Sequence, residues 1–196
     1  MKMAANLVLL LACAASVAAV VLSVYPGILR DVLFVLVLAS ILWLPLAAIA
    51  AVAWLVLMIR SKVRFIDWPW LRYGLAAAIL LSTFVLVLFY VPRRLAFAYS
   101  ISDFQALVEQ APVHESGGEP LNQRVGVFMV QDYAADPRGG VYFRVYQGGD
   151  GIGPDIMSYG FVHQPNREGT PYGAARYGLY HLGSGWYWFR ASDDWY

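Results

Sequence analysis

The chain has 196 residues, of which 60% are hydrophobic and 14% charged, and its formal net charge is +1. The apolar excess lies before Pro92, which excludes an ordinary soluble domain for that part of the chain. From Leu95 onward the balance is acidic, with six arginines and no lysine against eleven carboxylates. Because such a domain has no basic surface for phosphate backbones, we expect no nucleic-acid partner.

Three apolar segments predict three transmembrane helices, at residues of about 4–25, 32–59 and 73–91, within a membrane region 1–94. The third segment carries no charge and is long enough to cross a bilayer as a helix. The second contains Pro45, which predicts either a tolerated kink or a hinge. The first also has the composition of a signal peptide, but its uninterrupted length favours an uncleaved span over a cleaved signal. The lipid bilayer is therefore an expected partner.

The flanking charges predict the orientation of these segments. Four basic residues crowd the loop between the second and third segments, whereas the loop between the first two carries only Arg30. Basic loops stay cytoplasmic, so we expect a cytoplasmic amino terminus in an inner or plasma membrane and an extracytoplasmic carboxy-terminal domain. Arg93 and Arg94, after the third segment, oppose this assignment.

Residues 95–123 predict a short amphipathic helix and a linker. Ser102 and Gln105 form a capping box, and apolar residues then recur at helical spacing until Pro112. The apolar face of this helix can rest on the following domain or on the membrane. Asp103 and Glu109 favour the first alternative, because acids are unfavourable beside anionic lipid.

From residue 124 the hydrophobic period changes from helical to two, which predicts a small antiparallel β domain over 124–196. We expect about five strands. One runs through Val125, Val127 and Met129, and the others lie near residues 141–145, 156–163, 176–182 and 186–191. Gly183 and Ser184 stand where a tight hairpin joins the last two strands. The predicted fold class is membrane α+β.

Aromatic residues are unusually dense in this domain. Alternation places Trp186 and Trp188 on one side of a strand and Tyr187 and Phe189 on the other. If one side is the core, the other presents an aromatic surface suited to a protein or glycan partner outside the cytoplasm. The alternative is that the helix and the loops cover both faces. The predicted interaction surface comprises Tyr142, Tyr146, Tyr187, Phe189, Arg144 and Arg190.

Four residues are weaker site candidates. His163 and His181 would be neighbours if their strands pair, but neither has a second histidine or cysteine at metal-ligand spacing. Asp150 and Asp155 stand in a glycine-rich loop whose oxygens suit Ca²⁺, although the composition favours a plain hairpin loop over an ion site. We therefore assign no catalytic residue, cofactor or metal ligand.

The expected function is a non-enzymatic, membrane-anchored binding or assembly module that acts through the aromatic β domain. One alternative is a membrane-tethered hydrolase that uses His163 or His181 with a nearby carboxylate. Another is a scaffold that acts only through its membrane helices.

Overall fold

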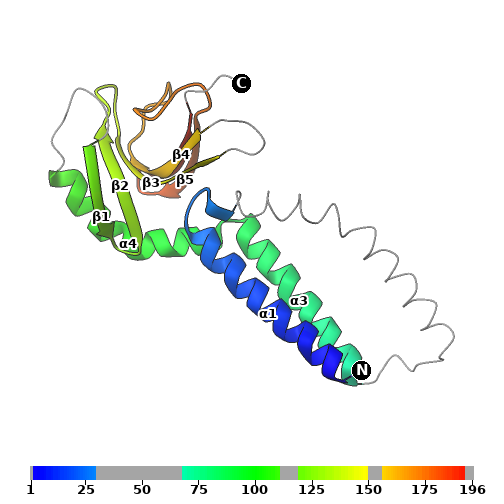
Figure 1. Ribbon diagram of the computed structural model, residues 1–196. Coiled ribbons are helices and arrows are strands. Elements are labelled where there is room, and N and C mark those ends of the chain that lie inside the picture. The colour runs from blue at the N-terminus through cyan, green and yellow to red at the C-terminus, as the bar shows by residue number, and fades with distance from the viewer. Residues whose placement is uncertain (1, 30–67, 111–118, 150–155, 193–196) are drawn as a thin grey trace. The chain divides into compact units, whose positions relative to one another are not determined.

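The computed structural model describes residues 2–29, 68–110, 119–149 and 156–192 (Figure 1). These residues form three helices and a six-stranded antiparallel sheet, which is an α+β fold. The predicted second span, 32–59, lies outside the described residues. Contacts divide the chain into two units, of which the first joins Met1–Val20 to Val32–Phe89 and the second joins Val21–Asp31 to Tyr90–Tyr196.

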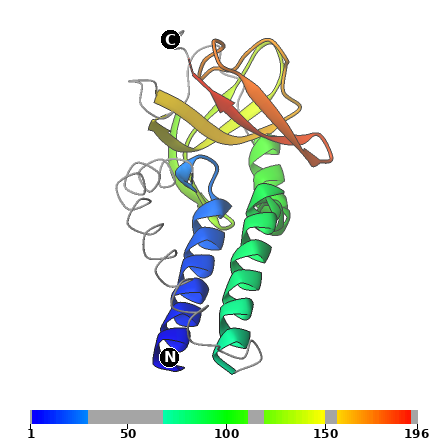
Figure 2. The same cartoon turned by 90° about the vertical axis from the view of Figure 1, so that its right-hand side faces the viewer.

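The first unit contains helix α3 (Trp68–Leu88) and most of helix α1 (Lys2–Val24). These two helices run side by side in the same direction (Figure 2). By length and composition, the described chain has two candidate membrane spans rather than the predicted three, Met3–Val24 and Leu71–Leu88. Either is long enough to cross a bilayer, and α1, near the amino terminus, also fits a signal sequence.

In the second unit, the predicted short helix is longer than its capping box indicated. Helix α4 spans Val91–Gln110, so Ser102 lies within the helix and does not cap it. The helix begins where Tyr90 adopts a positive φ of 56°, and Pro92 follows in the first turn, where its missing N–H costs nothing. Phe97, Ser100 and Phe104 follow one another at helical spacing and are all buried. They therefore form one continuous buried face of α4, which extends on both sides of the predicted start at Ser102.

The sheet follows α4 in the chain and has the strand order β1-β2-β3-β4-β6-β5. The last strand of the chain, β6, therefore lies between β4 and β5, and β5 is the edge strand. All neighbouring strands are antiparallel. The strands are β1 (Glu119–Val125), β2 (Phe128–Ala135), β3 (Val141–Gly149), β4 (Ile156–His163), β5 (Gly178–Gly183) and β6 (Trp186–Ala191).

The predicted first strand is in fact a hairpin, and part of the predicted linker is its first strand. Val125 pairs with Phe128, which leaves Gly126 and Val127 as a two-residue turn. Gly126 has a φ of 57°, and a Cβ there would lie 2.2 Å from Oγ of Ser100 on α4. Val127 matched the alternating pattern although it stands in the turn, so hydrophobic period alone missed the reversal.

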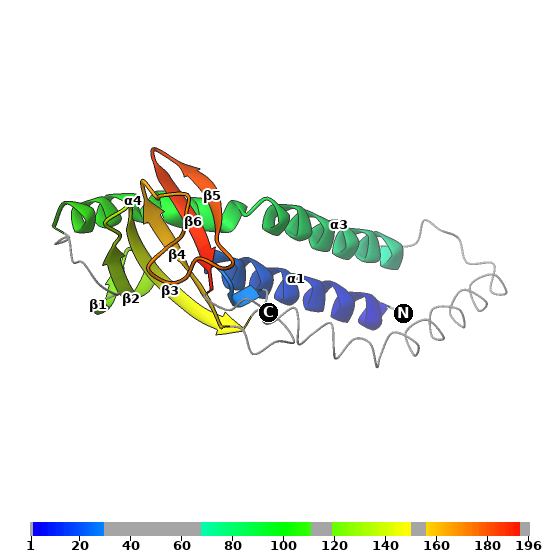
Figure 3. The same ribbon diagram turned by 90° about the horizontal axis from the view of Figure 1, so that it is seen from above.

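One face of the sheet packs against α4, as expected of the amphipathic helix. Figure 3 shows α4 running across the strands. Phe104 is fully buried, and its ring centroid lies 5.3 Å from that of Phe143 and 5.5 Å from that of Phe161. We call the buried residues on this face the helix-side core: Phe97, Phe104, Val125, Phe128, Val130, Phe143, Val145, Met157, Tyr159, Phe161, Trp186 and Trp188.

The opposite face is covered by the segment 164–177, which connects β4 to β5. We call the buried residues on this face of the sheet, together with the residues packed against them, the loop-side cluster: Tyr142, Val162, Phe189 and Ala191, with Tyr172, Tyr177, Leu179 and Tyr187 packed against them. The predicted alternation along β6 is confirmed, because Trp186 and Trp188 belong to the helix-side core and Tyr187 and Phe189 to the loop side. Both faces of the sheet are therefore covered, at least in part.

The residues that follow α1 are part of this second unit. The hydroxyl of Tyr25 donates to the carbonyl of Val127 (3.2 Å) and accepts from the backbone N–H of Met129 (3.0 Å). Pro26 is fully buried, and a Cβ at Gly27 would lie 2.6 Å from Cδ2 of Tyr159. The segment after the first helix is thus built into the β domain.

Candidate functional site

The six predicted interaction residues do not share one exposed surface. Tyr142 and Phe189 are 0% exposed, and their rings meet edge to face at 5.4 Å inside the loop-side cluster. They were expected on an open aromatic face, but the segment 164–177 covers that part of the sheet. Neither residue can contact a partner from this buried position.

Tyr146 and Arg190 lie on the helix side of the sheet. The ladder between β3 and β4 shifts between Arg144 and Tyr146, a β-bulge that breaks strict alternation. Tyr146 consequently packs against the helix-side core, with its ring 6.1 Å from that of Tyr159. Phe189 lies on the loop side of β6, so the next residue, Arg190, points to the helix side, like Tyr146.

Arg144 remains on the loop side, where its interactions are structural. Its guanidinium Nε donates to Oδ2 of Asp132 at 2.8 Å, and Nη2 contacts the same oxygen. The guanidinium carbon also lies 4.9 Å from the ring centroid of Tyr172. Burial is the main cause of the raised pKa of the Tyr172 phenol, so this hydroxyl stays protonated.

The covering segment is held near its start by a partly buried polar network. The carboxylate of Asp136 accepts hydrogen bonds from the Arg138 backbone N–H (2.9 Å) and guanidinium (2.8 and 3.0 Å), and from Nδ2 of Asn166 (3.1 Å). Burial opposes ionisation of Asp136, but the Arg138 hydrogen bonds outweigh it and lower the pKa of the carboxyl. Asn166 Oδ1 in turn accepts from the backbone N–H of Gly169 at 3.1 Å.

Two tyrosine hydroxyls complete this network. Tyr177 donates to the carbonyl of Asn166 at 3.0 Å, and its oxygen lies 3.1 Å from that of Tyr142. Tyr142 also donates to the carbonyl of Gly169 at 3.3 Å. Burial raises the pKa of Tyr177, and the bond to Tyr142 adds to the increase. The network therefore fixes both the segment and the ring of Tyr177.

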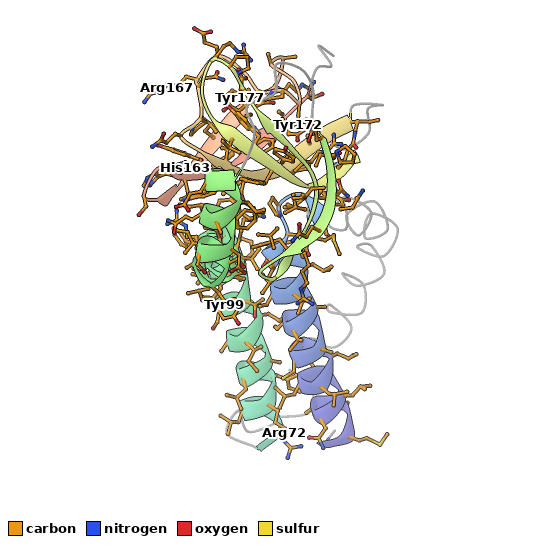
Figure 4. All side chains as sticks on the ribbon, turned by 90° about the vertical axis from the view of Figure 1, so that its left-hand side faces the viewer. Arg72, Tyr99, His163, Arg167, Tyr172 and Tyr177 are labelled. Atoms are coloured by element: carbon orange, nitrogen blue, oxygen red, sulfur yellow. The ribbon has the colours of Figure 1, made fainter. Side chains whose placement is uncertain are left out.

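An open pocket remains where this segment meets the β5–β6 hairpin. Its volume is about 610 Å³, which is in the range of small-ligand pockets. It is lined by Gln164, Pro165, Arg167, Tyr177, Leu179, Gly185 and Tyr187. Figure 4 labels Arg167 and Tyr177 at the same end of the domain. Tyr187 is the one predicted interaction residue in this lining.

The hairpin supplies three of the lining residues, of which Gly185 stands in its turn. The predicted tight hairpin is present, with its turn one residue later than expected: Gly183 pairs with Trp186, so Ser184 (φ 49°) and Gly185 (φ 79°) form a two-residue turn with both φ angles positive. The carbonyl of Gly185 accepts the backbone N–H of Gln164 at 2.8 Å. This bond ties the first residue of the covering segment to the hairpin.

The two histidines lie apart. Strand β6 separates β4 from β5, so His163 and His181 are on strands that do not pair. The imidazole ring of His163 lies on the helix side, tilted by 42° against that of Trp186 at a centroid distance of 4.9 Å, and burial lowers the pKa of His163. His181 meets Tyr187 at 5.0 Å on the loop side. The structure does not bring them into a common site.

The glycine-rich loop that contains Asp150 and Asp155 lies outside the described residues. Within the described ranges, no group of three or more histidine, cysteine, aspartate or glutamate side chains could hold a metal ion.

Arg93 is a buried cation that packs against aromatic rings, and sequence reasoning missed this role. It is 5% exposed, and its guanidinium carbon lies 4.5 Å from the Trp188 ring centroid and 5.1 Å from that of Tyr90. Nη2 donates to the carbonyls of Ser23 and Tyr25, each at 3.5 Å. Burial lowers the pKa of Arg93 to about 10, so it stays charged at neutral pH. Arg93 thus joins the segment after α1 to the sheet.

Comparison of this chain with protein-family models, with curated proteins and with solved structures finds no match.

Proposed function

We propose that this protein is a non-enzymatic, membrane-anchored module that binds a partner outside the cytoplasm through its β domain. The observation that carries the proposal is the open pocket between the segment 164–177 and the β5–β6 hairpin. Two loop-side aromatic residues of its lining, Tyr177 and Tyr187, are partly exposed, whereas Tyr142 and Phe189 are buried. We propose Tyr187 as the central contact residue.

The anchoring part of the proposal rests on the apolar helices and on the flanking charges. The basic loop, with Arg60, Lys62, Arg64 and Arg72, favours a cytoplasmic position for the chain before α3. An α3 that starts inside and an α1 with a cytoplasmic amino terminus both cross outward. The parallel course of α1 and α3 is compatible with that arrangement (Figure 2). The β domain then lies outside the cytoplasm.

Construction of the second unit favours an uncleaved first helix. Tyr25, Pro26 and Gly27 are part of the β domain, and Arg93 bonds to the carbonyls at the end of α1. If α1 is not cleaved, it continues directly into this segment and connects the segment to the membrane.

The alternative of a membrane-tethered hydrolase finds less support. A hydrolase that uses a histidine–carboxylate pair would need His163 or His181 beside a carboxylate. The two imidazoles lie on opposite faces of the sheet. Within the described residues, neither imidazole hydrogen-bonds to a carboxylate, and neither lines the pocket.

Site-specific photo-crosslinking tests the binding function in intact cells. The full chain carries p-benzoylphenylalanine in place of Tyr187 or, as a control, in place of Met129, which is 49% exposed on β2. We expect one discrete adduct from position 187 and none of that mass from position 129. Equal labelling at both positions, or no adduct at 187, would count against a binding role for this pocket.

A further inference from the structure

We infer that the pocket binds a short saccharide that carries a carboxylate group. This inference rests on the proposed binding function and names the class of its ligand. It follows from three properties of the lining residues: two tyrosine rings held by neighbouring groups, a glutamine whose backbone is fixed by a hydrogen bond, and an arginine without an ion-pair partner among the described residues.

The two tyrosine rings provide rigid walls. The hydroxyl of Tyr177 is held by the carbonyl of Asn166 at 3.0 Å, so the ring cannot turn freely. Tyr187 on β6 packs edge to face against His181 at 5.0 Å. Phenol rings offer apolar contact together with a polar group, and fixed rings lose little entropy on binding. A sugar ring has the matching character, with apolar C–H groups on its faces and hydroxyls at its edges.

Gln164 and Arg167 provide the polar part of the lining. The backbone of Gln164 is fixed by its bond to Gly185, and its side-chain amide can donate and accept hydrogen bonds. Sugar hydroxyls also donate and accept, so they can satisfy this amide. A lipid acyl chain could not, and it would leave buried polar groups without partners. The lining therefore favours a saccharide over a fatty chain.

The charge of the pocket selects an acidic sugar. Arg167 is the only charged residue in the described lining, and it is exposed. Arg138 and Arg144 pair with Asp136 and Asp132, but Arg167 has no ion pair within the described ranges. An arginine guanidinium matches a carboxylate with two parallel hydrogen bonds. From Leu95 onward the chain has eleven carboxylates against six arginines, which disfavours a polyanion and leaves a ligand with a single acidic group.

Titration calorimetry of the full chain in detergent micelles tests this inference. The probes are two matched pairs, glucuronate with glucose and galacturonate with galactose. We expect at least one acidic sugar to bind about tenfold more tightly than its neutral partner, the effect of a charged hydrogen bond. Arg167→Gln should remove that difference. The control Arg124→Gln, at the far edge of the sheet, should preserve it.

A second variant tests the aromatic wall. Tyr187→Ala should abolish binding of both sugars of a pair while the circular dichroism spectrum stays unchanged. Equal affinity for acidic and neutral sugars, or equal effects of Arg167→Gln and Arg124→Gln, would overturn the carboxylate part. Failure of all four probes to bind would overturn the saccharide inference itself. An adduct at position 187 in cells would still support the proposed binding function in either case.

Discussion

Removing the hydroxyl of Tyr25 tests whether the segment after α1 is part of the β domain. Tyr25→Phe keeps the ring, whose centroid lies 5.4 Å from that of Phe128, and deletes only the oxygen. That oxygen accepts from Met129 and donates to Val127, so the change removes two hydrogen bonds. Each contributes about 0.5–1.5 kcal/mol, and the Met129 group is near solvent, so we expect a loss of about 1–2 kcal/mol.

Thermal unfolding of the full chain in detergent, followed by near-ultraviolet circular dichroism, measures this loss. For a domain of this size the expected decrease in Tm is about 3–8 °C. The matched control is Tyr99→Phe, because Tyr99 is 78% exposed on α4, and its Tm should change by less than about 2 °C. Equal Tm values for Tyr25→Phe and the unmodified chain would refute the integration of this segment.

Three further substitutions test the packing and the network. Asp136→Asn should destabilise the domain by about 1–3 kcal/mol, because the carboxylate accepts charged hydrogen bonds from Arg138. The folded-state pKa of Asp136 is lowered, so its contribution exists above pH of about 4 and is lost as the pH falls through the folded pKa. Chemical denaturation between pH 7 and 3 should show this loss in the unmodified chain and not in the variant. Gly160→Ala should prevent folding, since its Cβ would lie 1.9 Å from the carbonyl oxygen of Phe143, and soluble yield after detergent extraction measures this. Phe104→Ala should cost about 3–5 kcal/mol in urea unfolding, as a large core truncation does.

Each of these substitutions has a control in the same chain. Glu168→Gln, at an exposed carboxylate, should leave the pH dependence unchanged. Gly149→Ala should be tolerated, because no atom lies within 4 Å of its Cβ position. Gln105→Ala, on the exposed face of α4, should cost less than about 0.5 kcal/mol. A Gly160→Ala protein that folds like Gly149→Ala, or a Phe104→Ala protein as stable as Gln105→Ala, would contradict the described packing.

Much of the sheet was predictable because strands impose a period of two. The alternation along β6 placed Trp186 and Phe189 on opposite faces, and the structure confirms this. The same rule failed where the backbone departs from a regular strand. Val127 fits the pattern but stands in a turn, and the bulge after Arg144 moves Tyr146 to the other face. Such departures depend on backbone geometry, which side-chain pattern does not report.

The candidate site was less predictable because it depends on contacts between distant residues. Arg167 and Tyr177 line one pocket only after the segment 164–177 folds onto the sheet, where Asp136 of the β2–β3 connection holds it. Tyr187 could be named from its strand position alone. Arg93 was seen only as a charge beside a membrane segment, since its aromatic neighbour Trp188 is 95 positions away in the sequence.

Accessibility of the pocket from outside the cell tests the central claim most directly. In a Cys13→Ser background, a single cysteine replaces the exposed Glu168 beside the pocket. A membrane-impermeant maleimide should label Glu168→Cys in intact spheroplasts and fail to label it in sealed inverted vesicles. Labelling in the inverted vesicles alone would put the β domain in the cytoplasm and contradict the account.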